Sequence, residues 1–241
     1  MIQVNQLCKR YGAIVAVDNM SFQVGRGEVL GFLGPNGAGK STTMKILSCF
    51  VRPDSGTAIL DGCDILTDPV GVRRRLGYVP ENAPLYDEMT AGSFLQFVCD
   101  ARGIRGRKAK DAIDRVVQLC NIGSVYHQVI ETLSKGYKRR VGLAQAFLHD
   151  PDILILDEPT DGLDPNQKHD VRELIRAMGK DKCIIVSTHI LEEVDAVCSR
   201  AIIIARGKIL ADGKPDELSR RGDGKLETYF RQITRSKEAA A

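Results

Sequence analysis

The stretch that decides the fold is Gly34–Ser41, which reads Gly-Pro-Asn-Gly-Ala-Gly-Lys-Ser. It matches the pattern G-x-x-x-x-G-K-[ST] at every fixed position. The glycines allow a tight backbone turn in which successive N–H groups point inward, where they can bind phosphate oxygens. The lysine supplies a positive charge to the β- and γ-phosphates, and the serine hydroxyl is placed to hold Mg²⁺. The stretch therefore predicts a nucleotide-phosphate loop.

The residues on either side of this loop support that interpretation. Val29–Leu33 is a short apolar run that predicts a buried strand, and residues 41 to 50 carry apolar side chains at helical spacing. Residues 52 to 56, Arg-Pro-Asp-Ser-Gly, end that helix. A plain glycine turn would not need a buried strand before it and a helix after it, because only the phosphate loop uses the helix N-terminus.

Strands and helices alternate along much of the remaining chain. We predict strands at Thr57–Leu60, Ile153–Leu156 and Cys183–Ser187, helices at Val171–Met178 and Leu191–Val197, and a hairpin of Ala201–Ala205 with Lys208–Ala211. Residues 88–150 are instead helical and richer in charge. This order predicts an α/β fold with a mostly parallel sheet and an inserted helical subdomain.

A second polar site follows the strand Ile153–Leu156. Asp157 and Glu158 are adjacent carboxylates at the C-terminal end of that strand, where open α/β sheets place their ligands. Asp157 suits the Mg²⁺ shell, and Glu158 suits a group that orients or deprotonates an attacking water. The acid pair therefore predicts hydrolysis of the bound nucleotide.

Three further short motifs accompany the acid pair. Leu133–Tyr137, LSKGY, opens a helix predicted over Lys138–His149, with Ser134 as its cap. Thr160–Asp164, TDGLD, follows the acid pair, and Ser187-Thr188-His189 ends the next strand.

These motifs, in this order, resemble the Walker A, signature, Walker B, D-loop and H-loop of the ABC ATPase family. The resemblance covers roughly residues 2–218, with the helical subdomain at about 88–150. It implies a P-loop NTPase core of the RecA type, an N-terminal antiparallel β subdomain, and ATP and Mg²⁺ as cofactors.

The resemblance also implies a role for individual residues. Glu158 and His189 are the expected catalytic residues, and Ser41, Glu81 and Asp157 the expected Mg²⁺ ligands. The expected ATP-binding residues are Tyr11, stacking on adenine, and Gly34, Pro35, Asn36, Gly37, Ala38, Gly39, Lys40, Ser41 and Thr42. The residues expected to act on the site of a second copy are Ser134, Lys135, Gly136 and Asp164. Tyr11 has an alternative reading as an aromatic side chain packed on a turn.

Two positions depart from the common family pattern. Glu81 stands where a glutamine is usual, and the signature reads LSKGY rather than LSGGQ. A carboxylate can still bind Mg²⁺, and Ser134 and Gly136 are kept. Both departures resemble the ABC-2 exporter branch that includes the gliding-motility type.

The bulk composition is that of an ordinary soluble globular protein. The 241 residues are 43% hydrophobic and 27% charged, with a formal net charge of +3. No apolar run approaches the roughly 18 residues that a membrane span needs, and the N-terminus lacks a secretory pattern, which predicts a cytoplasmic protein. The seven cysteines are scattered without CxxC spacing, which indicates thiols rather than a metal site.

The C-terminal tail, residues 219–241, accounts for the net positive charge. Residues 219–238 contain six basic and three acidic side chains, and the rest of the chain is balanced, which disfavours a nucleic-acid-binding face. Leu226, Tyr229, Phe230 and Ile233 form one apolar stripe of a predicted short amphipathic helix. The stripe can dock on the chain's own domain or on a partner, and Ala239–Ala241 are expected to be disordered.

The resemblance implies an ATP-hydrolysing subunit of a transporter. Two copies would form a head-to-tail dimer, and a separate integral membrane permease would hold the dimer at the inner face of the cell membrane. A soluble ABC ATPase, for example of the iron–sulfur cluster assembly type, is the alternative. A nucleic-acid-acting or ribosome-acting ABC protein is a third reading, but such proteins usually carry two ATPase units or a long coiled coil.

Overall fold

The structure is a computed structural model, and it describes residues 1–235. A six-stranded sheet forms its centre, with strand order β10-β9-β3-β8-β7-β6. All neighbouring strands are parallel except β10, which pairs antiparallel with β9. The strands are β3 (Val29–Leu33), β6 (Leu76–Val79), β7 (Ile153–Asp157), β8 (Cys183–Thr188), β9 (Arg200–Ala205) and β10 (Lys208–Gly213).

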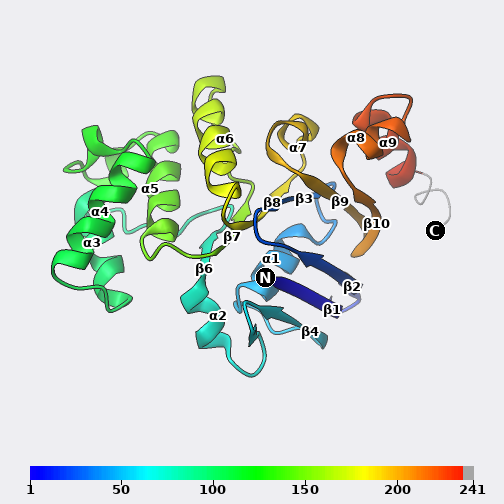
Figure 1. Ribbon diagram of the computed structural model, residues 1–241, viewed down its shortest axis with the longest axis horizontal. Coiled ribbons are helices and arrows are strands. Elements are labelled where there is room, and N and C mark those ends of the chain that lie inside the picture. The colour runs from blue at the N-terminus through cyan, green and yellow to red at the C-terminus, as the bar shows by residue number, and fades with distance from the viewer. Residues whose placement is uncertain (236–241) are drawn as a thin grey trace.

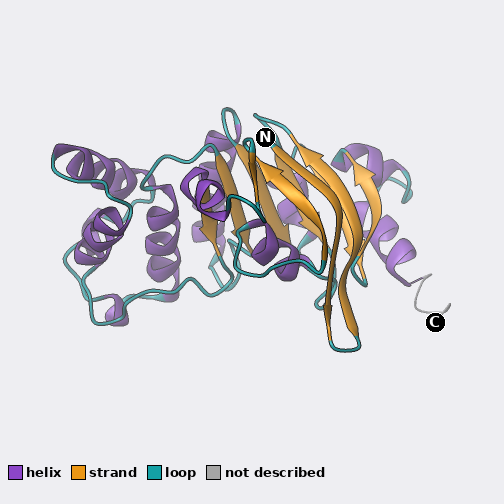
Figure 2. Ribbon diagram, turned by 90° about the horizontal axis from the view of Figure 1, so that it is seen from below, coloured by secondary structure: helices purple, strands orange, loops and turns teal. Residues whose placement is uncertain are grey.

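A smaller antiparallel sheet, with order β2-β1-β4-β5, lies beside the first, as the resemblance implied. Helix α1 (Lys40–Leu47) belongs to the same buried cluster as side chains of both sheets. Figure 2 shows the strands in orange, gathered on one side of the helical subdomain. The strands are β1 (Ile2–Tyr11), β2 (Ile14–Val24), β4 (Ser55–Leu60) and β5 (Cys63–Asp64). The short helix α2 (Pro69–Arg75) then leads into β6.

Strand β7 shows why the sequence forms a buried layer here. All five of its residues are buried, and alternate side chains point to opposite faces. Ile153 and Ile155 pack with α1 and the antiparallel sheet, whereas Leu154 and Leu156 pack with the helices on the other face. A strand covered on both faces reads as a continuous apolar run, which is why it was predictable.

The helical subdomain extends from one end of the sheet, in green in Figure 1. Its helices are α3 (Ala91–Ala101), α4 (Arg107–Leu119) and α5 (Lys135–Phe147), joined by the 3₁₀ turns Gly123–Val125 and Ile130–Thr132. Helix α6 (Pro165–Gly179) lies next along the chain, and α7 (Leu191–Val197) follows β8. One continuous apolar cluster joins α3, α4, α5 and α6 to the sheet, so the helices and core form one packed unit.

Several predicted helix limits were wrong, because a helix begins directly after its capping residue and ends where the backbone φ turns positive. Helix α5 begins at Lys135 rather than Lys138, because Ser134 Oγ accepts from the Tyr137 N–H. Helix α6 begins at Pro165 rather than Val171, because Asp164 caps it and proline favours the first helical position. Helix α1 ends at Leu47 rather than near residue 50, because Cys49 takes a positive φ of 60°.

Helix α8 (Pro215–Arg220), which ends at the start of the tail, and the tail helix α9 (Leu226–Arg235) lie at the opposite end of the sheet from the helical subdomain (Figure 1). Leu226 is buried in a cluster with Leu218 of α8 and side chains of β9, and Tyr229, Phe230 and Ile233 pack against that cluster. The apolar stripe therefore docks on its own chain. The expectation for Ala239–Ala241 lies outside the described residues.

Candidate functional site

The phosphate loop is shaped by glycine residues whose backbone conformation disfavours a side chain. Gly37 and Gly39 have positive φ values of 78° and 105°, which side chains disfavour. A Cβ atom on Gly39 would also lie 2.1 Å from the Ala16 carbonyl oxygen, which belongs to β2. The backbone of β2 therefore presses on the loop and fixes its curvature where α1 begins.

Lys40 is held inside the loop. Its side chain is only 6% exposed, and its Nζ donates to the Gly34 carbonyl at 2.8 Å and the Pro35 carbonyl at 3.3 Å. The same Nζ lies 3.5 Å from Glu158 Oε1. The ammonium group thus sits between the loop and the acid pair, where a nucleotide phosphate would need it.

The acid pair emerges from the end of β7 in two directions. Asp157 is 1% exposed, and its Oδ1 accepts from Ser41 Oγ at 3.3 Å and from the Ser187 hydroxyl. Glu158 follows with a positive φ of 49°, which turns its side chain into the cleft. There its Oε2 lies 3.0 Å from His189 Nδ1, at the end of β8. The turn separates a buried carboxylate next to Ser41 from a carboxylate that faces the cleft.

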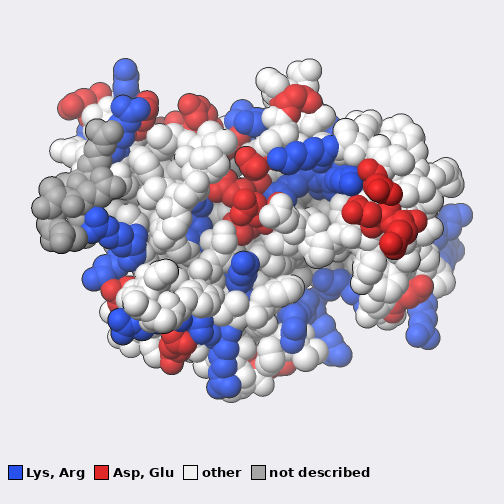
Figure 3. All heavy atoms as spheres, turned by 180° about the vertical axis from the view of Figure 1, so that it is seen from behind, with Lys and Arg blue, Asp and Glu red and all other residues white. Residues whose placement is uncertain are grey.

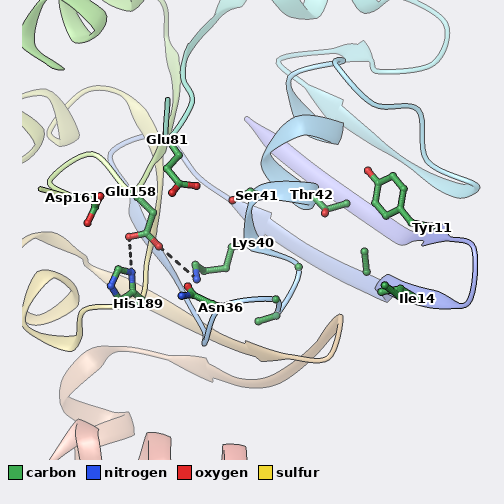
Figure 4. Close-up of a pocket in the computed structure, with 14 residues that line it drawn as sticks. Tyr11, Ile14, Asn36, Lys40, Ser41, Thr42, Glu81, Glu158, Asp161 and His189 are labelled. Carbon is green, nitrogen blue, oxygen red and sulfur yellow. Dashed lines mark hydrogen bonds and ion pairs between the residues drawn. The ribbon is translucent and has the colours of Figure 1, made fainter. Parts of the chain in front are cut away.

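A cleft of about 690 Å³ joins these residues (Figure 4). Tyr11 and Ile14 lie at the opposite end of it from Glu158 and His189. The cleft is long and open, with an aromatic side chain at one end and charged groups at the other. The predicted residues that line it are Tyr11, Asn36, Gly37, Ala38, Gly39, Lys40, Ser41, Thr42, Glu81, Glu158 and His189.

The donor atoms beside the loop fit a magnesium ion. Ser41 Oγ and Asp157 Oδ1 lie together, and Glu81 points into the same cleft from the segment after β6 (Figure 4). Hydroxyl and carboxylate oxygens are the hard ligands that Mg²⁺ takes, usually one or two of them together with substrate phosphates and water. A site of this kind needs no cluster of protein carboxylates.

The four residues expected to act on a second copy, Ser134, Lys135, Gly136 and Asp164, do not line this cleft. Ser134 caps α5, Asp164 caps α6 by accepting from Gln167 N–H at 2.9 Å, and Gly136 is buried against the Gln167 side chain. Lys135 Nζ lies 3.6 Å from an Asp161 carboxylate oxygen, and both side chains are largely exposed. The structure thus places these four residues around the starts of α5 and α6, outside the lining of the cleft, whereas Gly34, Pro35 and Asp157 lie beside the lining residues Lys40 and Ser41.

Sequence reasoning missed four residues at the site. Ile14, Ala16 and Asp161 line the cleft. Arg139 is buried beneath it and bonds to the backbone on both sides. Asp161 could have been chosen from its position in TDGLD, since it follows the acid pair closely. Nothing in the sequence marks Arg139, because one arginine in a charged helix is usually a solvated side chain.

Comparisons with known proteins agree with this geometry. A family model described as ABC transporter matches residues 17–161. The probable multidrug ABC transporter ATP-binding protein YbhF of Escherichia coli is 37% identical over 240 residues, 97% of this chain. The chain spans only 41% of that relative's length.

Two further similarities cover most of both proteins. The Nod factor export ATP-binding protein I of Ralstonia nicotianae is 36% identical over 219 residues, 90% of this chain and 68% of the relative. A solved ATP-binding subunit of an ABC transporter matches with a TM-score of 0.87 at 29% identity, covering 97% of this chain and 99% of the other. Since the family model covers more than half of a chain whose cleft also holds the expected phosphate loop and acid pair, this chain belongs to the family of ABC transporter ATP-binding proteins.

Proposed function

We propose that this chain hydrolyses ATP with Mg²⁺ and is the motor subunit of an ABC exporter. The observation that carries the proposal is the placement of Glu158, a buried carboxylate that faces the cleft between Lys40 and His189. A carboxylate in that position can accept a proton from water attacking the γ-phosphate, while the phosphate loop holds the leaving ADP.

The other cleft residues bind and orient the nucleotide. The amides of Gly37–Ser41 and the Lys40 ammonium bind its phosphates, and the Tyr11 ring stacks on the adenine at the far end of the cleft. Ser41, Asp157 and Glu81 would hold Mg²⁺, which when bound neutralises charge on the β- and γ-phosphate oxygens. His189 orients the γ-phosphate and fixes the Glu158 carboxylate through its Nδ1.

A second copy of the chain completes the site in this proposal. Ser134 presents its hydroxyl at the exposed N-terminus of α5, a natural anion-binding position that faces no phosphate loop in its own chain. In a head-to-tail dimer, Ser134, Lys135 and Gly136 would contact the nucleotide held by the other copy, with Asp164 at the same interface. ATP would then close the dimer, and hydrolysis would release it.

The membrane partner is a permease supplied as a separate protein. None of the helices among residues 1–235 has the length and apolar character to cross a bilayer. A groove of about 460 Å³ next to Glu81 is lined by Phe50, Tyr78 and Pro84, with cationic Arg73 and Arg102 among its walls. Phe50 is 70% exposed, so it offers apolar surface to a partner. We propose that a permease segment with apolar and acidic side chains fits this groove and places the protein at the inner face of the membrane.

The alternative functions have less support. A soluble ABC ATPase would share the whole cleft, and what favours an exporter is the pair of relatives named for multidrug transport and Nod factor export. On the face shown in Figure 3, the described acidic and basic side chains are interspersed, a distribution that does not favour nucleic acid as a partner.

The test has an enzymatic part and a membrane part. The purified chain should release phosphate from ATP only with Mg²⁺, and Lys40→Ala should weaken ATP binding. Co-expression with the permease should move the protein into the membrane fraction, and Phe50→Asp should return it to the supernatant without changing phosphate release. Absence of hydrolysis in folded protein would contradict the ATPase, whereas hydrolysis without sedimentation would favour the soluble alternative.

A further inference from the structure

Arg139, in the second turn of α5, lies beneath the cleft and is 8% exposed. A guanidinium group has five N–H donors in a rigid plane. Arg139 makes five hydrogen bonds, all to backbone carbonyls and none to a carboxylate. This buried cation is therefore a connector between backbone segments.

The five carbonyls belong to the two segments that carry the catalytic carboxylates. Nη1 donates to the carbonyls of Pro80 at 3.0 Å and Glu81 at 2.7 Å, in the segment after β6. On the β7 side, Nη2 donates to the carbonyls of Asp157 at 2.7 Å and Glu158, and Nε donates to the third carbonyl, that of Pro159, at 3.0 Å. One side chain of the helical subdomain thus binds the backbone at both Glu81 and Glu158.

The contact with Glu158 has a specific consequence. Glu158 is not glycine, yet its φ is 49°, a conformation that costs free energy unless its surroundings hold it. Its N–H is held at 3.1 Å by both the carbonyl and the hydroxyl of Ser187. Its carbonyl is held by Arg139. The two sets of bonds fix the peptide units on both sides of the Glu158 Cα, and so fix where its carboxylate points.

We propose that Arg139 is a positioning residue for hydrolysis, which holds the backbone of Glu158 and Glu81 so that both carboxylates face the bound nucleotide. The inference rests on the proposed ATPase function. Burial lowers the pKa of Arg139, and the nearby carboxylates of Asp157, Asp161, Glu81 and Glu158 oppose that shift. The guanidinium keeps its charge, and it offsets part of the repulsion among those acids.

Substitution by lysine separates positioning from charge. Arg139→Lys keeps the positive charge but has its three donors on one nitrogen. One nitrogen cannot reach the carbonyls of both segments, as the planar guanidinium does. We expect kcat to fall about 10–100-fold, as small misplacements of reacting groups do, with the KM for ATP unchanged because the phosphate loop is untouched. Arg139→Gln, which keeps two donors, should behave similarly and gives a second variant if the lysine form is poorly folded.

Arg115→Lys is the matched control. Arg115 Nη2 donates to the carbonyls of Phe147 and Leu148, at 3.0 and 3.1 Å, at the other end of α5. Arg115 itself lies on α4, so Arg115→Lys removes guanidinium-to-carbonyl bonds at the C-terminal end of α5, away from the cleft. It should lower the thermal midpoint without changing kcat.

The deciding measurement combines Arg139→Lys with Glu158→Gln. If Arg139 acts through Glu158 and Glu81, its replacement should cause a much smaller fold loss in the Glu158→Gln protein than in the wild-type protein, because only the effect through Glu81 remains. Equal fold losses in both backgrounds, a raised KM with unchanged kcat, or a wild-type kcat in folded Arg139→Lys would each overturn the inference. A wild-type protein without Mg²⁺-dependent hydrolysis would instead refute the proposed function.

Discussion

The phosphate loop and the signature segment are both helix N-termini, yet the fold holds them in opposite ways. Residues 38–40 of the phosphate loop are buried, with the Lys40 side chain only 6% exposed and the backbone of β2 pressed against Gly39. In the signature segment Ser134 and Lys135 are exposed, with the Lys135 side chain 69% exposed, and Gly136 meets a side chain rather than backbone. In the proposed dimer this difference has a reason, because a loop that binds nucleotide by itself needs a rigid backbone, whereas a segment that contacts the nucleotide of the other copy needs an accessible surface.

The largest expected effect is on hydrolysis in the cleft, where Glu158 lies next to the phosphate loop. Glu158→Gln should slow phosphate release by about 10²–10⁴-fold, the usual contribution of a positioned general base, and should retain ATP binding. Single-turnover phosphate release measures the rate, and a fluorescent ATP analogue measures binding. Unchanged turnover in the folded variant would remove Glu158 from the catalytic role.

The second prediction compares matched glycines in the two segments. Gly39→Ala places a Cβ 2.1 Å from a backbone carbonyl at a φ of 105°, so ATP affinity should fall by about 100-fold or more. Gly136→Ala meets only the end of the flexible Gln167 side chain, also at 2.1 Å, so the isolated chain should keep its ATP affinity. Equal losses in the two variants would mean that both segments are equally rigid.

The third prediction tests whether the signature segment contacts the nucleotide of a second copy. In a heterodimer of Lys40→Ala and Gly136→Asp chains, shared sites give one site with both lesions and one with neither. With Glu158→Gln added to both chains, we expect about one trapped ATP per heterodimer and almost none in either homodimer, as for a phosphate contact supplied in trans. Counting nucleotide in the purified heterodimer measures this.

A heterodimer without nucleotide would contradict the head-to-tail arrangement, provided that the Glu158→Gln parent traps ATP. In that case each chain would have to build its own complete site.

The fourth prediction concerns Glu81, which is exposed yet points into the cleft. If Glu81 is a Mg²⁺ ligand, Glu81→Gln should leave a working site that needs a few-fold more Mg²⁺, because an amide oxygen carries no charge. Glu81→Ala should need still more. ATPase rates measured against Mg²⁺ concentration test this, and three superimposable curves would make Glu81 a solvated surface charge.

The smallest expected effect is on the free energy of unfolding, through the contact that holds the end of α5 on the sheet. His149, just after α5, contacts the Leu76 carbonyl at 3.2 Å, and burial lowers its pKa from 6.5 to about 4. The folded state thus disfavours protonation, so the stability that neutral His149 provides is present above pH 6.5 and declines as the pH falls toward 4. At pH 5 the loss is about 2 kcal/mol.

Urea unfolding at pH 7 and pH 5 measures this loss. His149→Gln, which keeps a donor for Leu76, should show a smaller difference between the two pH values than the wild-type protein. An identical difference would assign the pH dependence to other groups.

Sequence reasoning was most successful where chemistry and burial coincide. The strands Val29–Leu33 and Ile153–Asp157 are covered on both faces, so each is a continuous apolar run in the sequence. Such a run can be recognised without knowing which strands it pairs with. It was weaker where a strand is short. Leu76–Val79 was not predicted, because a four-residue run with a glycine and a tyrosine carries no distinct period, and only its pairing with β7 makes it a strand.

The sequence by itself determined the phosphate loop, the acid pair and their family, because each depends on residue types at fixed short spacing. The tertiary structure alone decided that Arg139 joins the segments of Glu81 and Glu158, since its partners are backbone carbonyls, which have no residue identity. It alone also decided that the apolar stripe of α9 docks on its own chain. Hydrogen bonds to the backbone and the choice of a docking surface arise from how distant segments pack, and a local pattern does not record either.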